Sequence, residues 1–539
     1  MTTSNGEDPT PPDVRVDVPK ETEPETELTP HAHPHAPETV REVETKLRVH
    51  ALFRMPELSS AIGVDRVAPQ SIRELRAVYH DTDDLALFRW GVTLRRREGG
   101  GDAGWHMKLP VEGASEGTRD ELQVDLDEGE VGEVPLALSD TVTAFVRGAE
   151  LAPVVTLATH RVPYLLYDAE GLAFAEVVDD TVSVYDGDEV VERFREIEVE
   201  ALVADADVSG PVNLILANGG IPSKSSKAAS ALGPRAALPP DVLPPVAAGP
   251  DDAAGDAVTA FLRKHVRAFL TQDVRVRRDL PDAVHQMRVA ARRLRSGLKT
   301  FAPLVDQEWA DSLRAELKWA AGELGHARDT EVLLERLDAH AIELGEREAF
   351  LIRSVMDPVL RRRLQGARTH ALSAMRSERH AALLTSLVAA AAQPQFTPAA
   401  DSSCREVMPP LVKKSWKRLA RSVRELELVG PSESWHQARI AAKRARYAAG
   451  AVEPVFGAPA ERLEKALSLV TDVLGEHQDA CVAQDVIREI ANTPDVDGET
   501  GFALGLLHEH EFEEELHNRL QFLDVWPEVK RVYRATYLG

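Results

Sequence analysis

The chain has 539 residues, of which 43% are hydrophobic and 28% are charged, and its formal net charge at pH 7 is −25. A chain of this length is expected to form more than one domain, each with a core of its own. The acidic excess argues against a protein that binds nucleic acid or anionic membranes over its whole surface, although local basic sites remain compatible with it.

The cysteine content and the hydropathy pattern both predict a cytoplasmic protein. Only two cysteines occur, Cys404 and Cys481, which is too few for a disulfide framework and suits a reducing compartment. The first residues lack the basic and apolar segments of a signal peptide. The longest nearly apolar run, residues 383–392, is too short to cross a bilayer. We therefore expect neither a membrane partner nor a nucleic-acid partner.

Residues 1–38 are predicted to be a disordered tail. They are rich in Pro, Glu, Thr and His and contain almost no large apolar side chain, so burial cannot offset the entropy of ordering. The tail contains the sequence HAHPHAP, with His31, His33 and His35. A metal-binding tract is one interpretation of these histidines. A solvated tail is preferred because the spacing implies no fixed ligand geometry.

Residues 39–205 alternate between apolar and polar side chains with a period of two, which is typical of β-strands. Turn sequences rich in Gly and Asp separate the candidate strands. The predicted strands are 40–49, 76–81, 91–98, 104–109, 117–125, 153–161, 163–168, 173–178, 182–186 and 193–202. A helix is predicted over 138–149. So many antiparallel strands imply a sandwich or a closed barrel.

The period changes to 3.6 in the second half of the chain. The first domain ends with residues 206–232, in which NLILANGG predicts a helix that stops at glycine. A Pro/Ala/Gly-rich linker follows over 233–255. Residues 256–537 then read as successive amphipathic helices. The predicted fold class is therefore α+β in two domains, with a β domain over 39–232 and an all-α bundle over 256–537.

The helical half contains an internal repeat. The segment HQMRVAARRLRSGLKTF begins at His285, and HQARIAAKRARYAAGAV begins at His436. Each is followed at nearly the same distance by a related segment, LGHARD at 324–329 and LGEHQD at 474–479. A duplication with copies at about 256–400 and 401–537 would build a pseudo-symmetric helical bundle.

Both repeated helices carry a stripe of basic side chains at spacings of three and four residues, which places them on one helix face. The stripes are His285, Arg288, Arg292, Arg295 and Lys299 in the first copy, and His436, Arg439, Lys443 and Arg446 in the second. No acidic residue lies within 285–299 or 436–447. Like charges at these spacings repel by a few tenths of a kcal/mol per pair. In so acidic a chain, the stripes suggest that an external anion binds here.

Two other interpretations of the stripes remain open. Acids of neighbouring helices, such as Asp329 and Asp479, could neutralise them as ordinary ion pairs. The histidines, which include His326 and His477, could bind a metal, but arginine neighbours are electrostatically unfavourable for a cation. Guanidinium groups spaced about 5–6 Å along a helix match a row of phosphates. The stripes lack the interleaved aromatic residues of single-stranded nucleic-acid sites, so a phosphate chain without bases fits better.

The β half also carries charge at alternate positions. In REVETKLRV (41–49), Glu42, Glu44, Lys46 and Arg48 share one strand face and apolar or small side chains share the other. Similar strand faces carry Arg95, Arg97, Lys108, Arg161, Glu196, Glu198 and Glu200. Charged faces could simply point outward around an apolar core. Their number favours a polar lumen instead, where acids would bind hard cations and bases would hold phosphate oxygens.

The segments just described resemble a known pair of domain families. Glu42-x-Glu44-x-Lys46, followed in order by YHDTDDLALFRWGVTLRRR (79–97), GWHMKLP (104–110), EVVDDTVSV (176–184) and FREIEVEAL (194–202), resembles the CYTH family of triphosphate tunnel metalloenzymes over about residues 38–232. The helical half, with its paired histidine–arginine helices, resembles the CHAD domain. The resemblance implies an eight-stranded antiparallel β-tunnel that hydrolyses inorganic triphosphate or another triphosphate compound with Mg²⁺ or Mn²⁺. It also implies that the CHAD domain binds inorganic polyphosphate.

The resemblance further implies roles for individual residues. Glu42, Glu44 and Lys46 match the catalytic signature, in which the two glutamates bind metal and the lysine contacts phosphate. Arg95, Arg97, Lys108 and Arg161 correspond to phosphate-binding residues of the tunnel. Glu198 and Glu200, with Glu196 as a further candidate, match late metal-binding acids, and Asp180 matches an acid of the preceding strands. Either Lys224 or Lys227 corresponds to a further family lysine.

Other functions compatible with the resemblance stay open. The tunnel could have become a non-catalytic polyphosphate sensor. It could also act on thiamine triphosphate or cyclise ATP, as other CYTH proteins do. A nucleoside substrate would need aromatic or apolar walls at the tunnel mouth, for which Trp90 and Trp105 are candidates, although core packing is the commoner role of a tryptophan.

Overall fold

The structure is a computed structural model that describes residues 37–111, 113, 117–203 and 206–536. The predicted tail of residues 1–38 lies outside the described residues, apart from its last two positions.

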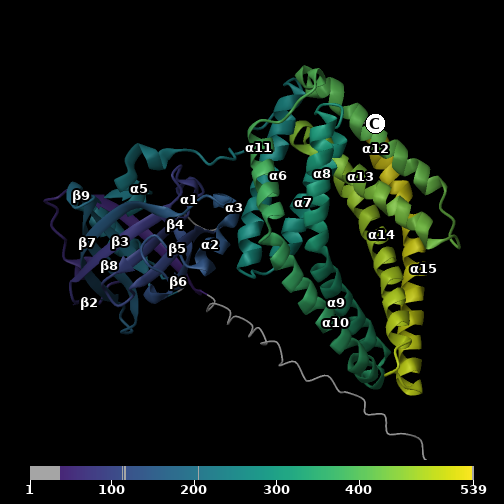
Figure 1. The fold of residues 1–539 in the computed structure, drawn as a ribbon, viewed down its shortest axis with the longest axis horizontal. Helices are drawn as coiled ribbons and strands as arrows, with labels where there is room; N and C mark the ends of the chain where they lie inside the picture. Colours follow the sequence, from purple (N-terminus) through teal and green to yellow (C-terminus); the bar gives the residue numbers. More distant parts are fainter. Residues whose placement is uncertain (1–36, 112, 114–116, 204–205, 537–539) are drawn as a thin grey trace, which may run out of the picture. The chain divides into compact units, whose positions relative to one another are not determined.

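Eight antiparallel strands close into a barrel in the N-terminal half (Figure 1). Hydrogen-bonded neighbours follow the order β1-β6-β5-β4-β3-β7-β8-β9, and β9 returns to β1. The strands are β1 Glu38–Val49, β3 Arg73–Asp81, β4 Thr93–Glu98, β5 Gly104–Pro110, β6 Thr118–Val124, β7 Ala152–Tyr167, β8 Ala173–Asp186 and β9 Glu189–Ala201. Two short strands, β2 Arg66–Pro69 and β10 Ile221–Ser223, add to β7 and β1. The predicted eight-stranded antiparallel barrel is confirmed.

Several predicted elements differ in detail from the structure. Strands β7 and β8 are continuous, whereas the sequence predicted a break near Pro163 and another before residue 182. Proline is tolerated inside β7 because β3 pairs with this strand only as far as Arg161, and β2 takes over at Tyr164. The single helix predicted over 138–149 is divided into α2 Leu136–Thr141 and α3 Thr143–Val146.

The barrel wall has apolar side chains on its outer face and charged side chains on its inner face. On β1 and β9, Leu47 and Ile197 belong to a buried apolar cluster that includes Ile215 of helix α4, Ser209–Ala217, which covers this part of the wall. Because strand side chains alternate, the intervening residues of both strands point into the lumen. Apolar residues close part of the lumen, where Leu157 and Val184 contact Ala228 of helix α5, Lys227–Leu232.

The C-terminal half is entirely helical in the described residues (Figure 1). Its helices are α6 Ala254–Arg277, α7 Ala283–Thr300, α8 Gln307–Glu323, α9 Gly325–Leu344, α10 Glu346–Met375, α11 Glu378–Ala392, α12 Cys404–Arg424, α13 Ser432–Phe456, α14 Ala458–Ala491 and α15 Gly498–Ala535. Helices α9 and α10 form one long hairpin and α14 and α15 form another. A shared apolar cluster that includes Leu337, Ile352, Ile487 and Leu504 joins the two hairpins. None of the described helices combines the length and the apolarity needed to cross a bilayer.

The internal duplication is visible in the backbone. The two copies meet where α6 and α12 begin, through a reciprocal pair of hydrogen bonds. The amide of Ala254 donates to the carbonyl of Ser402, and the amide of Cys404 donates to the carbonyl of Asp252, both at 2.9 Å. Helices α7 and α13, which carry the two basic stripes, pack against each other. The copies differ at Leu324, where the first copy breaks between α8 and α9 while α14 runs without a break.

Close packing of α6 against α7 requires glycine at position 297. A Cβ at Gly297 would lie 2.2 Å from Cε1 of the Phe261 ring. Substitution Gly297→Ala should therefore lower the free energy of unfolding of the helical domain by about 1–3 kcal/mol, because an overpacked core must shift. This loss should appear even though alanine favours a helix over glycine by about 1 kcal/mol. Urea denaturation followed by helical ellipticity measures it.

The matched control is Gly366→Ala in the middle of α10, where an added Cβ would meet nothing within 4 Å. This variant should be at least as stable as the unmodified protein, since only the helix propensity changes. Equal stabilities of the two variants would contradict the packing argument.

Candidate functional site

The strand register brings the predicted charged residues together in the barrel lumen. Glu44 lies opposite Glu200, and Lys46 lies opposite Glu198, between β1 and β9. Across β7 and β8, Arg161 lies opposite Asp180. Because all these positions share the inward parity of their strands, acids and bases from the whole circumference converge on one volume.

Lys46 lies between two carboxylates. Its Nζ is 3.0 Å from Glu44 Oε1 and 3.2 Å from Glu198 Oε1. Burial disfavours the ammonium, but the charges of Glu198 and Glu44 outweigh it and raise the pKa of Lys46 above its ordinary value. Lys46 is therefore a permanent cation, and 17% of its side chain remains exposed, so a ligand in the lumen could reach it.

A second group of ion pairs surrounds Glu198. Arg161 donates to both oxygens of Asp180 at 2.9 and 2.7 Å and to Glu198 at 3.0 Å. Lys227, at the start of α5, places its Nζ 2.8 Å from Asp180, 2.7 Å from Glu198 and 3.2 Å from Glu196. Burial opposes ionisation of Glu198, but the charges of Lys227, Lys46 and Arg161 outweigh it and lower the pKa of Glu198 well below its ordinary value.

A third group lines the wall formed by β4, β5 and β6. Lys108 is ion-paired with Glu42, and Arg95 Nη2 is 3.7 Å from Glu121. Burial opposes ionisation of Glu121, but the hydrogen bond from His106 and the charges of Lys108 and Arg95 lower its pKa far below the ordinary range. Three of the predicted lumen residues therefore lie close to Glu121.

Carboxylates are crowded at one place in the lumen. Burial and the charges of Glu42 and Glu44 raise the pKa of Glu200 to about 7. Glu200 thus lies near two other carboxylates, and carboxylate oxygens are the donors that a hard divalent cation such as Mg²⁺ or Mn²⁺ prefers. The chemistry of these side chains is compatible with the metal that the sequence predicted, and the role of Glu42, Glu44 and Glu200 as its ligands stays a prediction. Glu198, also predicted as a ligand, is held by three cations, and its role as a ligand stays a prediction.

Three predicted residues have surroundings other than those expected. Arg97 is ion-paired with Asp102 in the turn between β4 and β5, so it lies at the edge of the lumen cluster. Trp105 points out of the lumen into a fully buried apolar cluster, and its indole N–H donates to the carbonyl of Gly129 at 3.1 Å. Trp90 stacks on Phe145 with ring centroids 4.8 Å apart. Both tryptophans pack, and neither lines the lumen.

Sequence reasoning left some lumen residues unassigned. Glu121 shares a charged strand face with Arg119 but received no role from the sequence, although pairing the predicted strands 104–109 and 117–125 would place it directly opposite Lys108. Tyr79, whose hydroxyl accepts a hydrogen bond from Arg95 at 3.5 Å, gave no signal beyond its strand parity. Lys227 was one of two candidates, and only the position of α5 brings it to the lumen acids.

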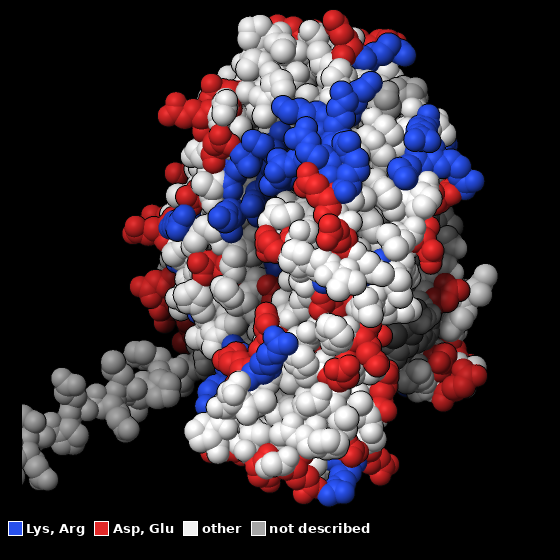
Figure 2. Space-filling model, turned by 90° about the vertical axis from the view of Figure 1, so that its right-hand side faces the viewer, with Lys and Arg blue, Asp and Glu red and all other residues white. Residues whose placement is uncertain are grey.

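The two basic stripes face each other across α7 and α13 and form what we call the basic patch: His285, Arg288, Arg292, Arg295, Lys299, His436, Arg439, Lys443 and Arg446. Burial and the charges of Arg439 and Arg292 lower the pKa of Lys443 to about 8. Positive charge therefore accumulates where the helices meet. One face of the protein carries a continuous area of Lys and Arg side chains, with Asp and Glu mostly below it and at its margins (Figure 2).

Acids neutralise part of the basic patch. Arg288 pairs with Asp329 at 3.0 Å and Arg439 with Asp479 at 3.7 Å, which are the two acids that the alternative interpretation named. Arg446 pairs with Glu464 at 2.8 Å. The remaining arginines and lysines of the patch, Arg292, Arg295, Lys299 and Lys443, form no ion pair with any described residue. Ion pairing thus accounts for part of the patch and leaves a surplus of cations.

Guanidinium atoms without hydrogen-bond partners also indicate that the basic patch has more cations than acids. The Nε atoms of Arg292 and Arg439 are buried and have no hydrogen-bond partner among the described residues. Buried donors without acceptors are rare in folded proteins, and an anion would satisfy them. Further cations that the sequence stripes omitted come from other helices: Arg314 of α8 lies near Arg295, and Arg328 of α9 lies near His285.

The histidines of the repeats do not form a convincing metal site. His477, Cys481 and Glu515 offer ligand atoms within 4.8 Å of one another. However, Arg519 Nε donates to His477 Nε2 at 3.1 Å, and the same guanidinium pairs with Glu515. An arginine already uses the lone pair that a metal would need, as the electrostatic argument from the sequence predicted. In the second stripe, His436 Nδ1 is hydrogen-bonded to Gln478.

Comparison with known proteins agrees with this division into two domains. Residues 40–208 match the CYTH domain and residues 260–488 match the CHAD domain. The chain is 33% identical over 508 residues to the uncharacterised protein Rv2226 of Mycobacterium tuberculosis H37Rv, an alignment that covers 87% of this chain and 92% of that protein. The chain belongs to the CYTH–CHAD family.

Two solved structures resemble parts of this CYTH–CHAD protein. PptA from Streptomyces chartreusis is 28% identical, covers 51% of this chain and 100% of its own, and has a TM-score of 0.46. The CHAD domain from the plant Ricinus communis is 27% identical, covers 52% of this chain and 94% of its own, and has a TM-score of 0.42.

Removing Lys227 should destabilise the barrel. In Lys227→Met, Asp180, Glu196 and Glu198 lose the cation that they share, and buried carboxylates without a partner are costly. We expect the free energy of unfolding of the barrel to fall by about 3 kcal/mol. Urea denaturation followed by hydrogen–deuterium exchange of β8 and β9 measures this change.

The control for this substitution is Lys465→Met. Lys465 pairs with Glu461 on the protein surface, where 70% of its side chain is exposed, and its loss should have little effect. If both variants kept the stability of the unmodified barrel, the ion pairs of Lys227 would not be what stabilises it.

Proposed function

We propose that the barrel of this CYTH–CHAD protein is a metal-dependent hydrolase of inorganic triphosphate or a related triphosphate compound. CYTH domains are typically metal-dependent enzymes of triphosphates, with Mg²⁺ or Mn²⁺. The observation that carries the proposal for this chain is the lumen, where a crowded set of carboxylates adjoins a row of cations with exposed faces. Phosphoryl transfer needs these two parts, because its catalysis is mainly positioning and charge neutralisation.

The lumen residues divide into two roles. Glu42, Glu44 and Glu200 would hold a divalent cation through their oxygens. When bound, the metal would neutralise phosphate charge and activate water. Lys46 and Lys108, which keep 17% and 19% of their side chains exposed, would bind phosphate oxygens in exchange for their present carboxylate partners. Arg95 and Arg161 would extend this row of cations, and Arg97 would contact the chain at the edge of the lumen.

Inorganic triphosphate is preferred over a nucleoside or thiamine substrate. Recognition of a ring system in the lumen would need aromatic walls. The two tryptophans that could have supplied them, Trp90 and Trp105, are engaged in packing.

The CHAD domain, we further propose, binds inorganic polyphosphate through the basic patch. Arg292 and Lys443 lie near each other and form no ion pair with any described residue, and the buried Nε atoms of Arg292 and Arg439 lack hydrogen-bond acceptors among those residues. A chain of phosphates supplies both the charge and the acceptor oxygens that these groups lack. The cytoplasmic location predicted from the sequence stays a prediction.

The substitution Glu44→Gln tests the hydrolase. It removes one negative charge from the metal site and keeps the shape of the side chain, so Mg²⁺-dependent phosphate release from inorganic triphosphate should fall at least about 100-fold. The assay compares inorganic triphosphate, longer polyphosphates, thiamine triphosphate and ATP, each with and without Mg²⁺.

The matched control is Glu74→Gln on β3, a glutamate whose side chain is 75% exposed and pairs with His160 outside the lumen. This variant should keep full activity. Unchanged turnover in Glu44→Gln would contradict the proposal that the lumen is the active site. If the unmodified protein hydrolysed none of the substrates, the non-catalytic sensor would be favoured instead.

Polyphosphate binding should depend on pH through Lys443. This lysine is cationic below its pKa of about 8 and becomes neutral above it, so affinity should be full near neutrality and decline as pH rises. Between about pH 7 and pH 9.5, we expect a roughly tenfold loss of affinity for long-chain polyphosphate. Isothermal titration calorimetry at constant ionic strength measures it.

Two variants test whether the loss of affinity at high pH comes from deprotonation of Lys443. In Lys443→Arg the decline should disappear, because a guanidinium stays charged throughout this range. The double charge reversal Arg292→Glu with Lys443→Glu should abolish binding at every pH. Wild-type affinity in the double variant would mean that the basic patch is merely structural.

A further inference from the structure

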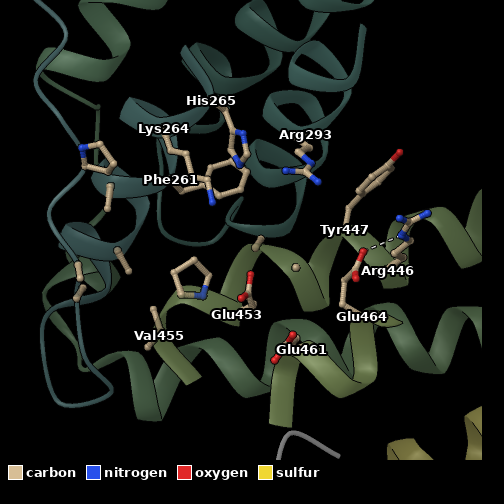
Figure 3. Close-up of a pocket in the computed structure, with 18 of the residues that line it drawn as sticks. Phe261, Lys264, His265, Arg293, Arg446, Tyr447, Glu453, Val455, Glu461 and Glu464 are labelled. Atoms are coloured by element: carbon tan, nitrogen blue, oxygen red, sulfur yellow. Dashed lines mark hydrogen bonds and ion pairs between the residues drawn. The ribbon is translucent and has the colours of Figure 1, made fainter. Parts of the chain in front are cut away.

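A cavity of about 570 Å³ lies in the CHAD domain, and none of the lumen residues lines it (Figure 3). Helices α6, α13 and α14 contribute most of its lining, and linker residues 245–248 form another part. Much of this lining is apolar, with Ala257, Ala260, Phe261, Ala451 and Val455 among its residues. Of the residues assigned to the two proposed activities, only Arg446 lines this volume, which lies within the range of small-molecule sites.

Two cations without partners stand on the α6–α7 side of the cavity. Lys264 and Arg293 are exposed, line the cavity and form no hydrogen bond or ion pair with any described residue. Both lie near His265. An anionic group at the mouth of the cavity would therefore meet a lysine and an arginine that are free to bind it.

His265 is a buried polar group facing the same space. The residue is only 6% exposed, its ring packs edge-on against Phe261 with centroids 4.4 Å apart, and no described residue hydrogen-bonds to its side chain. Burial and the charges of Arg293 and Lys264 lower its pKa to about 3. The neutral imidazole thus offers one donor and one acceptor.

The opposite wall of the cavity carries three glutamates (Figure 3). Glu464 accepts a hydrogen bond from Arg446 at 2.8 Å, and Glu461 pairs with Lys465 at 2.6 Å. Glu453 forms no ion pair or side-chain hydrogen bond with any described residue, and its carboxylate is free to accept from a ligand.

We propose that this cavity binds a nucleoside phosphate. The base would occupy the apolar interior beside Phe261, an amino group on its edge would donate to Glu453, and the phosphate would bind Lys264 and Arg293 at the mouth. Each part of the ligand would thus contact one feature of the cavity: the apolar lining, the carboxylate of Glu453 or the two cations. A bare phosphate chain would leave the apolar lining unfilled, and a hydrocarbon would leave the cations and Glu453 unpaired.

The cavity adjoins the basic patch, because Arg446 belongs to the patch and also lines the cavity, but the two differ in their other residues. Arg292 and Arg293 are consecutive on α7, and consecutive helical residues point about 100° apart. Arg292 belongs to the patch, near Lys443, whereas Arg293 lines the cavity near His265. Substitutions at these two positions can therefore distinguish binding in the cavity from binding of phosphate by the patch.

Isothermal titration calorimetry of the full chain with AMP, GMP and CMP tests the proposal. Monophosphates are used because they lack the triphosphate group that the lumen would bind. At least one of them should bind at micromolar concentration, and at least tenfold more tightly than ribose 5-phosphate or inorganic phosphate. No binding at millimolar concentration, or binding no tighter than that of ribose 5-phosphate, would overturn the proposal.

Variants locate the site. Arg293→Ala should weaken nucleotide binding at least tenfold, while Arg292→Ala on the same helix should leave it unchanged. Ala260→Phe should abolish binding by filling the cavity, with circular dichroism showing that the helices remain folded. The proposal fails if Arg293→Ala binds like the unmodified protein. It also fails if Arg292→Ala and Arg293→Ala weaken binding equally, because the patch would then hold the phosphate.

Discussion

The barrel depends on ion pairs between buried side chains of opposite charge. An isolated charge in a protein interior costs several kcal/mol, so a buried acid that is ionised requires a cation within reach. Glu198 has three, since Lys46, Arg161 and Lys227 all lie within 3.2 Å of its oxygens. Because charged side chains occupy much of the lumen, many apolar residues of the strands are buried outside the wall, where Leu47 and its neighbours pack against covering elements. In the proposed function, a phosphate chain in the lumen would take the place of the carboxylates as the counter-ion of the cations.

The surroundings shift the pKa values of two lysines, one in each half of the protein, in opposite directions. In the lumen, carboxylates outweigh burial and raise the pKa of Lys46. In the basic patch, burial and neighbouring guanidinium groups lower the pKa of Lys443 to about 8. The lumen is therefore balanced in itself and would exchange one set of counter-ions for another, whereas the patch carries unbalanced charge that an external anion would neutralise. This difference suits the proposed division between a site that positions a short phosphate chain and a surface that binds a long one.

Much of the fold and of the lumen followed from local periodicity. The alternating charges of β1 and β9 predicted inward carboxylates and bases, and the repeated 3.6-residue pattern predicted paired basic helices. Predictions that depended on contacts between residues distant in the chain were less specific. Lys227 could not be chosen over Lys224, because only the folded position of α5 brings it to the lumen. Trp105 was considered for the tunnel mouth, but it lies on the face of β5 that other elements cover.

The sequence by itself determined which side chains share a face. Backbone geometry sets that property locally, with a period of two along a strand and 3.6 along a helix. Only the tertiary structure decided what each face meets. Arg288 pairs with Asp329 and Arg439 with Asp479 across helix contacts, while Arg292, on the same stripe as Arg288, forms no ion pair with a described residue. Such differences arise from helix packing and strand register, which depend on contacts between residues far apart in the chain and which no local period encodes.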